Sequence, residues 1–161
     1  MIRKLNAFAW CLAGLLAVSS WCLAGEEKEG GHKTAHGGCL NVIEKCAIGH
    51  MEVILEGDTL KVWFVGGDNA TTTSVRVKAK EIPLLVTTDG GETVRPLTLT
   101  AKPLALAEET VGDCSHFTAS APWLKDAESF VAVGVVRVKG VLRVLRIDYP
   151  EGFDPDDDHD H

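Results

Sequence analysis

Aromatic side chains and positive charge are both scarce in this chain. Of its 161 residues only 6% are aromatic, with a single tyrosine, and 16 Lys and Arg stand against 23 Asp and Glu, which gives a formal net charge of −7. A nucleic-acid-binding protein needs a basic face to contact phosphates, so this composition argues against that class. At 45% hydrophobic and 24% charged residues, the sequence is also too apolar to remain unfolded as a whole.

Motifs of the common enzyme classes are absent from the sequence. It contains no Gly-x-Ser-x-Gly, no phosphate-binding P-loop, no His-Glu-x-x-His and no Gly-x-Gly-x-x-Gly. Cys114 and His116 would share one face of a strand, but an oxidising compartment disfavours a cysteine–histidine thiol catalyst. We therefore expect a protein that is not an enzyme.

A long hydrophobic run occurs only once, at the N-terminus. Arg3 and Lys4 precede an uncharged, mostly apolar stretch from Ala7 to Leu23, and a small-residue cleavage pattern ends at Ala24. This pattern is typical of a secretory signal peptide. We expect residues 1–24 to be removed on export to the periplasm or the medium, with an uncleaved membrane anchor as the alternative. Cleavage removes two basic residues and no acidic one, so the net charge changes from −7 to −9.

The rest of the chain divides into three parts, and none of them contains a second run that could span a membrane. Residues 25–35 are polar and rich in glycine and are predicted to form a flexible lead-in. Residues 154–161, Asp-Pro-Asp-Asp-Asp-His-Asp-His, are predicted to be a disordered acidic tail. Between them, residues 36–153 show the alternating, β-branched pattern of strands. One β domain is therefore expected.

Turn-forming residues divide this domain into hairpins. Strands are predicted at 51–56 and 59–65, at 82–88 and 92–100, and at 129–138 and 141–149, with shorter ones at 74–78 and 116–120. Pro83 and Pro96 indicate that the second pair lies at a sheet edge or begins late. About eight short strands joined by glycine-rich turns predict a β-sandwich or a small barrel.

Three of the five cysteines, Cys39, Cys46 and Cys114, follow the expected cleavage site. An exported protein can keep a disulfide. Cys39 and Cys46 lie too far apart to be bonded if the chain between them is extended, so a Cys46–Cys114 disulfide is favoured, and closing so long a loop contributes roughly 4 kcal/mol. The alternative is three reduced, buried thiols that pack as small apolar side chains.

Histidines near two of these cysteines point to metal chemistry. His50 follows Cys46 by four residues and His116 follows Cys114 by two, so the predicted disulfide would bring the two imidazoles together. If the thiols are reduced, the same four residues form a possible Cys₂His₂ set for zinc or copper. Two histidines hydrogen-bonded to backbone groups are the competing interpretation.

The acidic tail contains two more histidines, His159 and His161. Carboxylates and imidazoles together suit divalent nickel, copper or zinc, so the tail is a candidate for weak metal binding. A solubilising tail without a metal role is the alternative.

Three short motifs between His36 and Val65 resemble those of a known group of proteins. His36-Gly37-Gly38, His50-Met51-Glu52 and Leu60-Lys-Val-Trp-Phe64 are similar to the head pattern of a group of poorly characterised bacterial exported proteins, often associated with heavy-metal efflux systems. This chain departs from that pattern by having Cys39, Cys46 and Ile48 in the connecting segment. The resemblance implies an immunoglobulin-like β-sandwich of seven to eight antiparallel strands with a link to metal handling.

Taken together, these patterns predict an exported β-sandwich that binds or buffers a transition metal, namely copper, zinc or nickel. The candidate ligands are five histidines: His36, His50, His116, His159 and His161. An envelope or efflux protein is the expected partner. The alternative is an interaction module of the cell envelope that has no role in metal binding.

Overall fold

The computed structural model describes residues 33–156, which fold into an all-β domain. The prediction of a β protein is therefore confirmed. Within this range the only helical elements are short 3₁₀ turns: η1 (Asp68–Ala70), η2 (Asp89–Gly91), η3 (Ala105–Ala107) and η4 (Pro122–Asp126). The strands are β1 (Cys39–Val42), β2 (His50–Glu56), β3 (Thr59–Val65), β4 (Glu81–Thr88), β5 (Thr93–Ala101), β6 (His116–Ser120), β7 (Phe130–Val138) and β8 (Val141–Tyr149).

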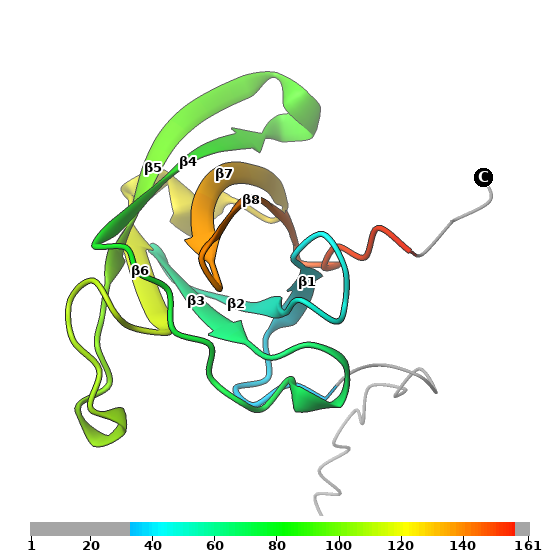
Figure 1. Cartoon of the computed structure of the whole chain (residues 1–161). Helices are drawn as coiled ribbons and strands as arrows, with labels where there is room; N and C mark the ends of the chain where they lie inside the picture. The colour runs from blue at the N-terminus through cyan, green and yellow to red at the C-terminus, as the bar shows by residue number, and fades with distance from the viewer. Residues whose placement is uncertain (1–32, 157–161) are drawn as a thin grey trace, which may run out of the picture.

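All eight strands belong to one antiparallel sheet, in the order β1-β2-β3-β6-β5-β4-β7-β8. The three long hairpins, β2–β3, β4–β5 and β7–β8, are those that the turn residues predict. The sheet curls into a nearly closed barrel, with the strands arranged around a ring in Figure 1. The immunoglobulin-like sandwich is not confirmed, because a sandwich requires two packed sheets.

The barrel closes where the end of the chain meets its first strand. After β8, the segment 150–153 turns and runs parallel to β1: the N–H of Val42 donates to the carbonyl of Phe153 (2.6 Å) and the N–H of Phe153 to the carbonyl of Leu40 (3.2 Å). The buried Asn41 side chain also accepts the N–H of Asp148 (2.8 Å). First and last elements are thus joined by a short seam, and the residues after Phe153 emerge beside the loop that follows β1.

Alternate residues of each strand point into the barrel and form one apolar core. Phe64 and Phe117 pack edge to face at its centre, with ring centres 5.6 Å apart. The other fully buried large members of the core are Ile43, Met51, Leu60, Ile82, Leu99, Leu124, Leu145 and Ile147. Two outward-facing residues at the start of β2, His50 and Glu52, are fully buried as well.

Two sequence expectations need adjustment. Residues 74–78 form isolated bridges only, for example between Val77 and Cys114, and not a strand. Pro83 and Pro96 lie on strands with neighbours on both sides, but each falls where the second ladder has not begun: β4 pairs with β7 from Leu84 onward, and β5 pairs with β6 only at Thr100 and Ala101. The missing N–H of each proline therefore interrupts no hydrogen bond of the β4–β7 or β5–β6 pairing.

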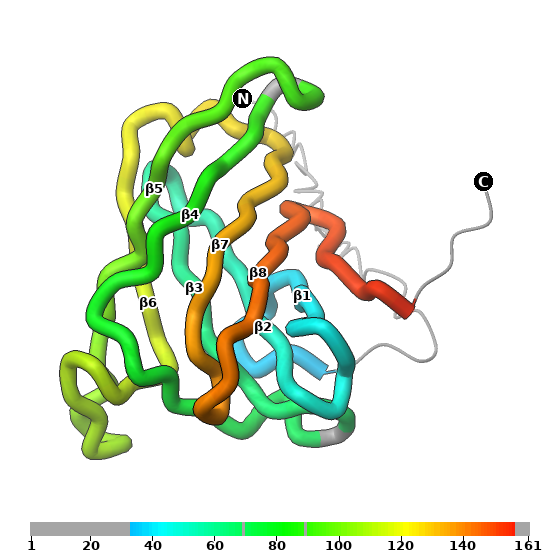
Figure 2. Tube along the Cα trace, turned by 45° about the horizontal axis from the view of Figure 1, so that its top comes forward, coloured from blue at the N-terminus to red at the C-terminus, as the bar shows by residue number. Residues whose placement is uncertain are grey.

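No helix within residues 33–156 is long and apolar enough to cross a membrane. The expected signal peptide, residues 1–24, lies outside the described residues, as do His159 and His161 and most of the expected lead-in. Figure 2 shows the last described segment (red) projecting away from the barrel after β8, while the β4–β5 hairpin extends at the top of the view.

Candidate functional site

A fully buried carboxylate, Glu52, holds the segment before β1 against the barrel. One of its oxygens accepts the N–H groups of His36 (2.6 Å) and Gly38 (3.0 Å), and the other accepts the N–H of Ala35 (3.2 Å) and Nδ1 of the His36 ring (2.8 Å). Four donors thus converge on one side chain with no exposed surface. We call this group, residues 35–38 with Glu52, the N-terminal latch.

The electrostatics of the latch follow from its hydrogen bonds. Burial alone would raise the pKa of Glu52, but the N–H of Gly38 and the imidazole and N–H of His36 outweigh it and hold that pKa below its ordinary value of 4.5. No residue with a side chain fits at position 38 without a shift of the backbone, because a Cβ on Gly38 would lie 2.5 Å from the carbonyl oxygen of Val53. The His-Gly-Gly and His-x-Glu motifs are therefore two halves of one structural unit.

Three rings stack on the outer face of the sheet beside the latch. The Trp63 ring lies 4.2 Å from the His36 ring and 4.6 Å from the His116 ring, centre to centre, and the planes are nearly parallel. In the strand register Trp63 is opposite Glu52 on β2 and opposite His116 on β6. His36, which is held on Glu52, and His116 therefore approach the indole from opposite sides.

This stack does not assemble a metal site from His36 and His116. Rings on opposite faces of one indole have centres about 9 Å apart at these stacking distances, whereas one ion bound by two imidazoles at about 2.1 Å needs the nitrogens within about 4 Å. Both ring nitrogens of His116 are buried and have no hydrogen-bond partner among the described residues. Burial, with His36 nearby, lowers the pKa of His116, so the ring is neutral and packs as an aromatic.

His50, the third histidine of the barrel, is buried and hydrogen-bonded to the backbone. It lies on the same face of β2 as Glu52, is fully buried, and its Nδ1 donates to the carbonyl of Gly66 (3.0 Å). Among the described residues, His50 does not belong to any group of three potential metal-ligating side chains. The three histidines of the barrel are thus close together in the fold but do not converge on one point.

The three described cysteines are free thiols, so the expected Cys46–Cys114 disulfide is not seen in the structure. Cys46 lies in the loop before β2 and Cys114 directly before β6, with β3 between those strands. Two strand spacings amount to about 9–10 Å, and a disulfide requires Cα atoms closer than about 7 Å. Cys114 is buried, and its Sγ contacts the carbonyl of His116 instead (3.5 Å).

Within residues 33–156, only one cluster brings three potential metal-ligating side chains together: Cys46, Asp154 and Asp156. One ligand atom from each, the Sγ and two carboxylate oxygens, lies within 4.8 Å of the others. The Sγ of Cys46 is 3.9 Å from Oδ2 of Asp154. The Cys₂His₂ set that the spacing allows is not assembled, whereas Cys46 of that set meets two aspartates instead.

The fold fixes both sides of this cluster. The carbonyl of Cys46 accepts the N–H of Asp68 (3.2 Å), and Gly67 packs so closely that a Cβ would lie 2.0 Å from that carbonyl oxygen. On the other side, the seam at Phe153 delivers Asp154, whose Oδ1 accepts the N–H of Asp156 (3.0 Å). This bond leaves Oδ2 of Asp154 facing the sulfur.

The thiol of Cys46 sits in a negative environment. Burial raises its pKa, and the carboxylates of Asp154, Asp156 and Asp68 raise it further. Because the thiolate and two carboxylates would repel one another, the free protein keeps the thiol protonated, and a bound cation would reverse that preference.

The sequence does not bring these three side chains together. It places Asp154 and Asp156 in an acidic tail that is a candidate for weak, flexible metal binding, and it places Cys46 in a disulfide or a Cys₂His₂ set. The available signal was the composition itself: an acidic run that ends in two histidines begins one residue after Phe153, where the chain is still paired with β1. Only the tertiary structure shows that this run starts beside a thiol.

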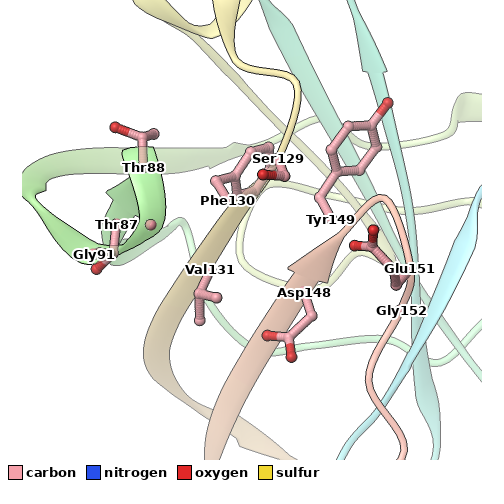
Figure 3. A pocket seen from close by; sticks show the side chains of 11 residues that line it. Thr87, Thr88, Gly91, Ser129, Phe130, Val131, Asp148, Tyr149, Glu151 and Gly152 are labelled. Carbon is pink, nitrogen blue, oxygen red and sulfur yellow. The ribbon is translucent and has the colours of Figure 1, made fainter.

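A cleft of about 480 Å³ lies at the C-terminal end of β8, lined among others by Ser129, Phe130, Tyr149 and Glu151. Phe130 and Tyr149 stack along it, with ring centres 5.2 Å apart. Its polar groups do not converge: in Figure 3 the Tyr149 hydroxyl and the Asp148 carboxylate point away from each other. Asp148 is moreover paired with Arg146 (2.9 Å).

No family model, curated protein or solved structure matches this chain. The resemblance carried by the His-Gly-Gly and His-x-Glu motifs therefore stays a prediction.

Proposed function

We propose that this is an exported protein that binds a divalent transition metal ion, with Cys46, Asp154 and Asp156 as ligands from the folded domain. The observation that carries the proposal is the convergence of a thiol and two carboxylates within 4.8 Å, at a place where the backbone on both sides is fixed. Export rests on the signal-peptide pattern of residues 1–24.

The distances suit a tetrahedral ion after a small contraction. With a metal–sulfur bond of about 2.3 Å and metal–oxygen bonds of about 2.0–2.2 Å, the sulfur and oxygen of a tetrahedral site are about 3.5 Å apart. The free protein has 3.9 Å between Sγ of Cys46 and Oδ2 of Asp154. A rotation of either side chain closes this difference without a change in the backbone.

The donor set selects the class of metal. A thiolate disfavours magnesium and calcium, which take oxygen ligands, while one sulfur with two carboxylates suits zinc and similar divalent ions. Zinc is therefore the first metal to test, and copper and nickel are the comparison.

The tail can supply the remaining ligand. His159 and His161 follow Asp156 by three and five residues, and three residues of chain span up to about 10 Å, which is enough for an imidazole to return to an ion held at Asp156. The proposed site thus combines a rigid part, formed by the domain, with a part donated by the C-terminal sequence.

Calorimetric titration of the purified, reduced protein with zinc tests the proposal. We expect one strong site, weakened at least tenfold by Cys46→Ser. Cys39→Ser is the matched control, because Cys39 is also a partly buried thiol but lies outside the cluster, and it should bind as the wild type does. Replacing His159 and His161 by alanine should weaken binding while leaving the Cys46-dependent part measurable.

Two results would contradict this assignment. Zinc binding equal in Cys46→Ser and wild type would place the ion elsewhere, and binding abolished by the two tail substitutions alone would leave the folded domain without a role. Absence of binding by zinc, copper and nickel to the reduced protein would remove the metal function altogether.

An interaction module is the second candidate function. It is favoured by one specific observation, an exposed apolar face on β4, β7 and β8, where Leu85, Val133 and Val144 are 53%, 42% and 61% exposed. This face shares no residue with the metal cluster, so both functions can belong to one molecule.

A further inference from the structure

The outer face of one side of the barrel is apolar. Outward positions of a solvated antiparallel strand are normally polar, yet six such positions on three neighbouring strands carry valine or leucine. We call them the valine face: Leu85 on β4, Val131, Val133 and Val135 on β7, and Leu142 and Val144 on β8. All six are between 37% and 61% exposed.

The register places several of these side chains directly beside one another. Leu85 is directly opposite Val133, and Val135 is directly opposite Val144. Pro83 and Pro96 continue the patch across β4 and β5, where a groove of about 490 Å³ runs past Val133 and Val135. Val133 therefore has apolar neighbours on β4 and β7, while Arg146 is opposite it on β8.

The size of the valine face fits a protein contact. From the exposed fractions, the six side chains present on the order of 500 Å², which is at the upper end of the largest patch on a typical monomer. A standard interface buries about 800 Å² on each partner, as an apolar centre within a polar rim. The six side chains thus supply a large part of the area that one partner of such an interface buries.

The charges at the rim indicate what kind of surface meets it. The outward positions of β7 and β8 beside the valine face carry Arg137, Arg146 and Asp148, although the whole chain has a net charge of −7. Arg146 is paired with Asp148, so these two strands present no unpaired carboxylate on that face. The valine face therefore does not repel an acidic chain, and a second copy of this protein is such a chain.

We infer that two copies associate through their valine faces as a twofold-symmetric dimer. An apolar sheet face is complementary to itself, so a symmetric contact needs no separate partner surface. The two sheets pack about 10 Å apart, with the side chains of β7 from each copy at the centre. The contact shares no residue with the proposed metal site.

Analytical ultracentrifugation over a range of protein concentrations tests the inference, with a chelator present so that metal cannot bridge the copies. We expect a dimer for the wild type. Val133→Lys should weaken it by at least about tenfold, because the lysine is introduced twice, at the centre of a symmetric apolar contact. Val133→Thr keeps the shape and the strand preference and should weaken it less.

Leu106→Lys is the matched control, since Leu106 is fully exposed on η3, outside the valine face, and it should leave the dimer unchanged. Circular dichroism of each variant checks that the fold is kept. A wild type that is monomeric at all concentrations overturns the inference, as does a dimer that Val133→Lys does not weaken. Binding of a monomeric protein to lipid vesicles through Val133 would also overturn it, by assigning the face to a membrane.

Discussion

Replacing Glu52 by glutamine should destabilise the protein severely, because its carboxylate is the acceptor for the entire N-terminal latch. The side chain is fully buried and accepts four donors, from Ala35, His36 and Gly38. Glutamine keeps one oxygen for two of these donors but turns an NH₂ group toward the other two. A hydrogen bond to a charged group contributes about 1.5–3 kcal/mol, and a buried donor without an acceptor costs about 1–3 kcal/mol. We expect a loss of about 4 kcal/mol.

Urea unfolding at pH 7 measures this loss, and Glu56→Gln is the control. Glu56 lies on the same strand, but it is 59% exposed and forms only a surface ion pair with Lys61, so its substitution should cost less than about 1 kcal/mol. A loss below about 1 kcal/mol for Glu52→Gln would refute the reasoning, since the latch would then not depend on the carboxylate.

The pH dependence gives a second check on Glu52. Its pKa is below 4.5 in the folded protein, so its contribution to stability is fully present above that ordinary value and is lost as the pH falls through the folded pKa. The difference between wild type and Glu52→Gln should therefore stay constant from pH 5 to 7 and shrink below about pH 4. A difference that does not shrink in acid would assign the loss to packing instead of charge.

Three shorter predictions follow from the same region and from the metal cluster. Gly38→Ala should lower the unfolding free energy by about 2 kcal/mol in urea titrations, because its Cβ would lie 2.5 Å from the carbonyl of Val53. His116→Phe keeps the stack on Trp63 and removes two buried nitrogens without partners. Since burial lowers the pKa of His116, the wild type should lose stability as the pH falls below about 6.5, and the variant should lose less. Zinc affinity should rise by up to about tenfold per pH unit between pH 6 and 8, because the raised pKa of Cys46 makes binding release a proton; calorimetry of Cys46→Ser should show a flatter profile.

Strand positions were predictable because they depend on local patterns. Alternation of apolar residues and the glycine turns place the hairpins within a residue or two of β2–β3, β4–β5 and β7–β8. Whether eight strands form two sheets or one is decided by pairings between distant segments, such as β3 with β6 and the seam at Phe153. Local sequence carries no information on these pairings, so the strand pattern allows a sandwich or a barrel, and the predicted immunoglobulin-like sandwich is not confirmed by the single curled sheet.

The candidate site was predictable only in part, and for a similar reason. The sequence indicated metal-binding residue types and singled out His36, His50 and Cys46, but not what each one contacts. In the structure, the ring of His36 is hydrogen-bonded to the buried carboxylate of Glu52, and the ring of His50 is hydrogen-bonded to the carbonyl of Gly66. The carboxylate of Asp154 lies close to the thiol of Cys46. These partners come from other parts of the chain, and spacing along the sequence does not identify them.

The seam between Phe153 and β1 has a consequence for how the molecule opens. Only a few backbone hydrogen bonds join Val42 and Leu40 to Phe153, fewer than along any long hairpin, so amide protons there should exchange with solvent early, before global unfolding. An ion bound by Cys46 and Asp154 would link the loop after β1 to the segment after Phe153, and would so hold the two sides of that seam together. Slower exchange of the Val42 amide on adding zinc would then show that metal binding stabilises the closed barrel. The strength of that binding, including the contribution of the C-terminal histidines, would set how slow the exchange becomes.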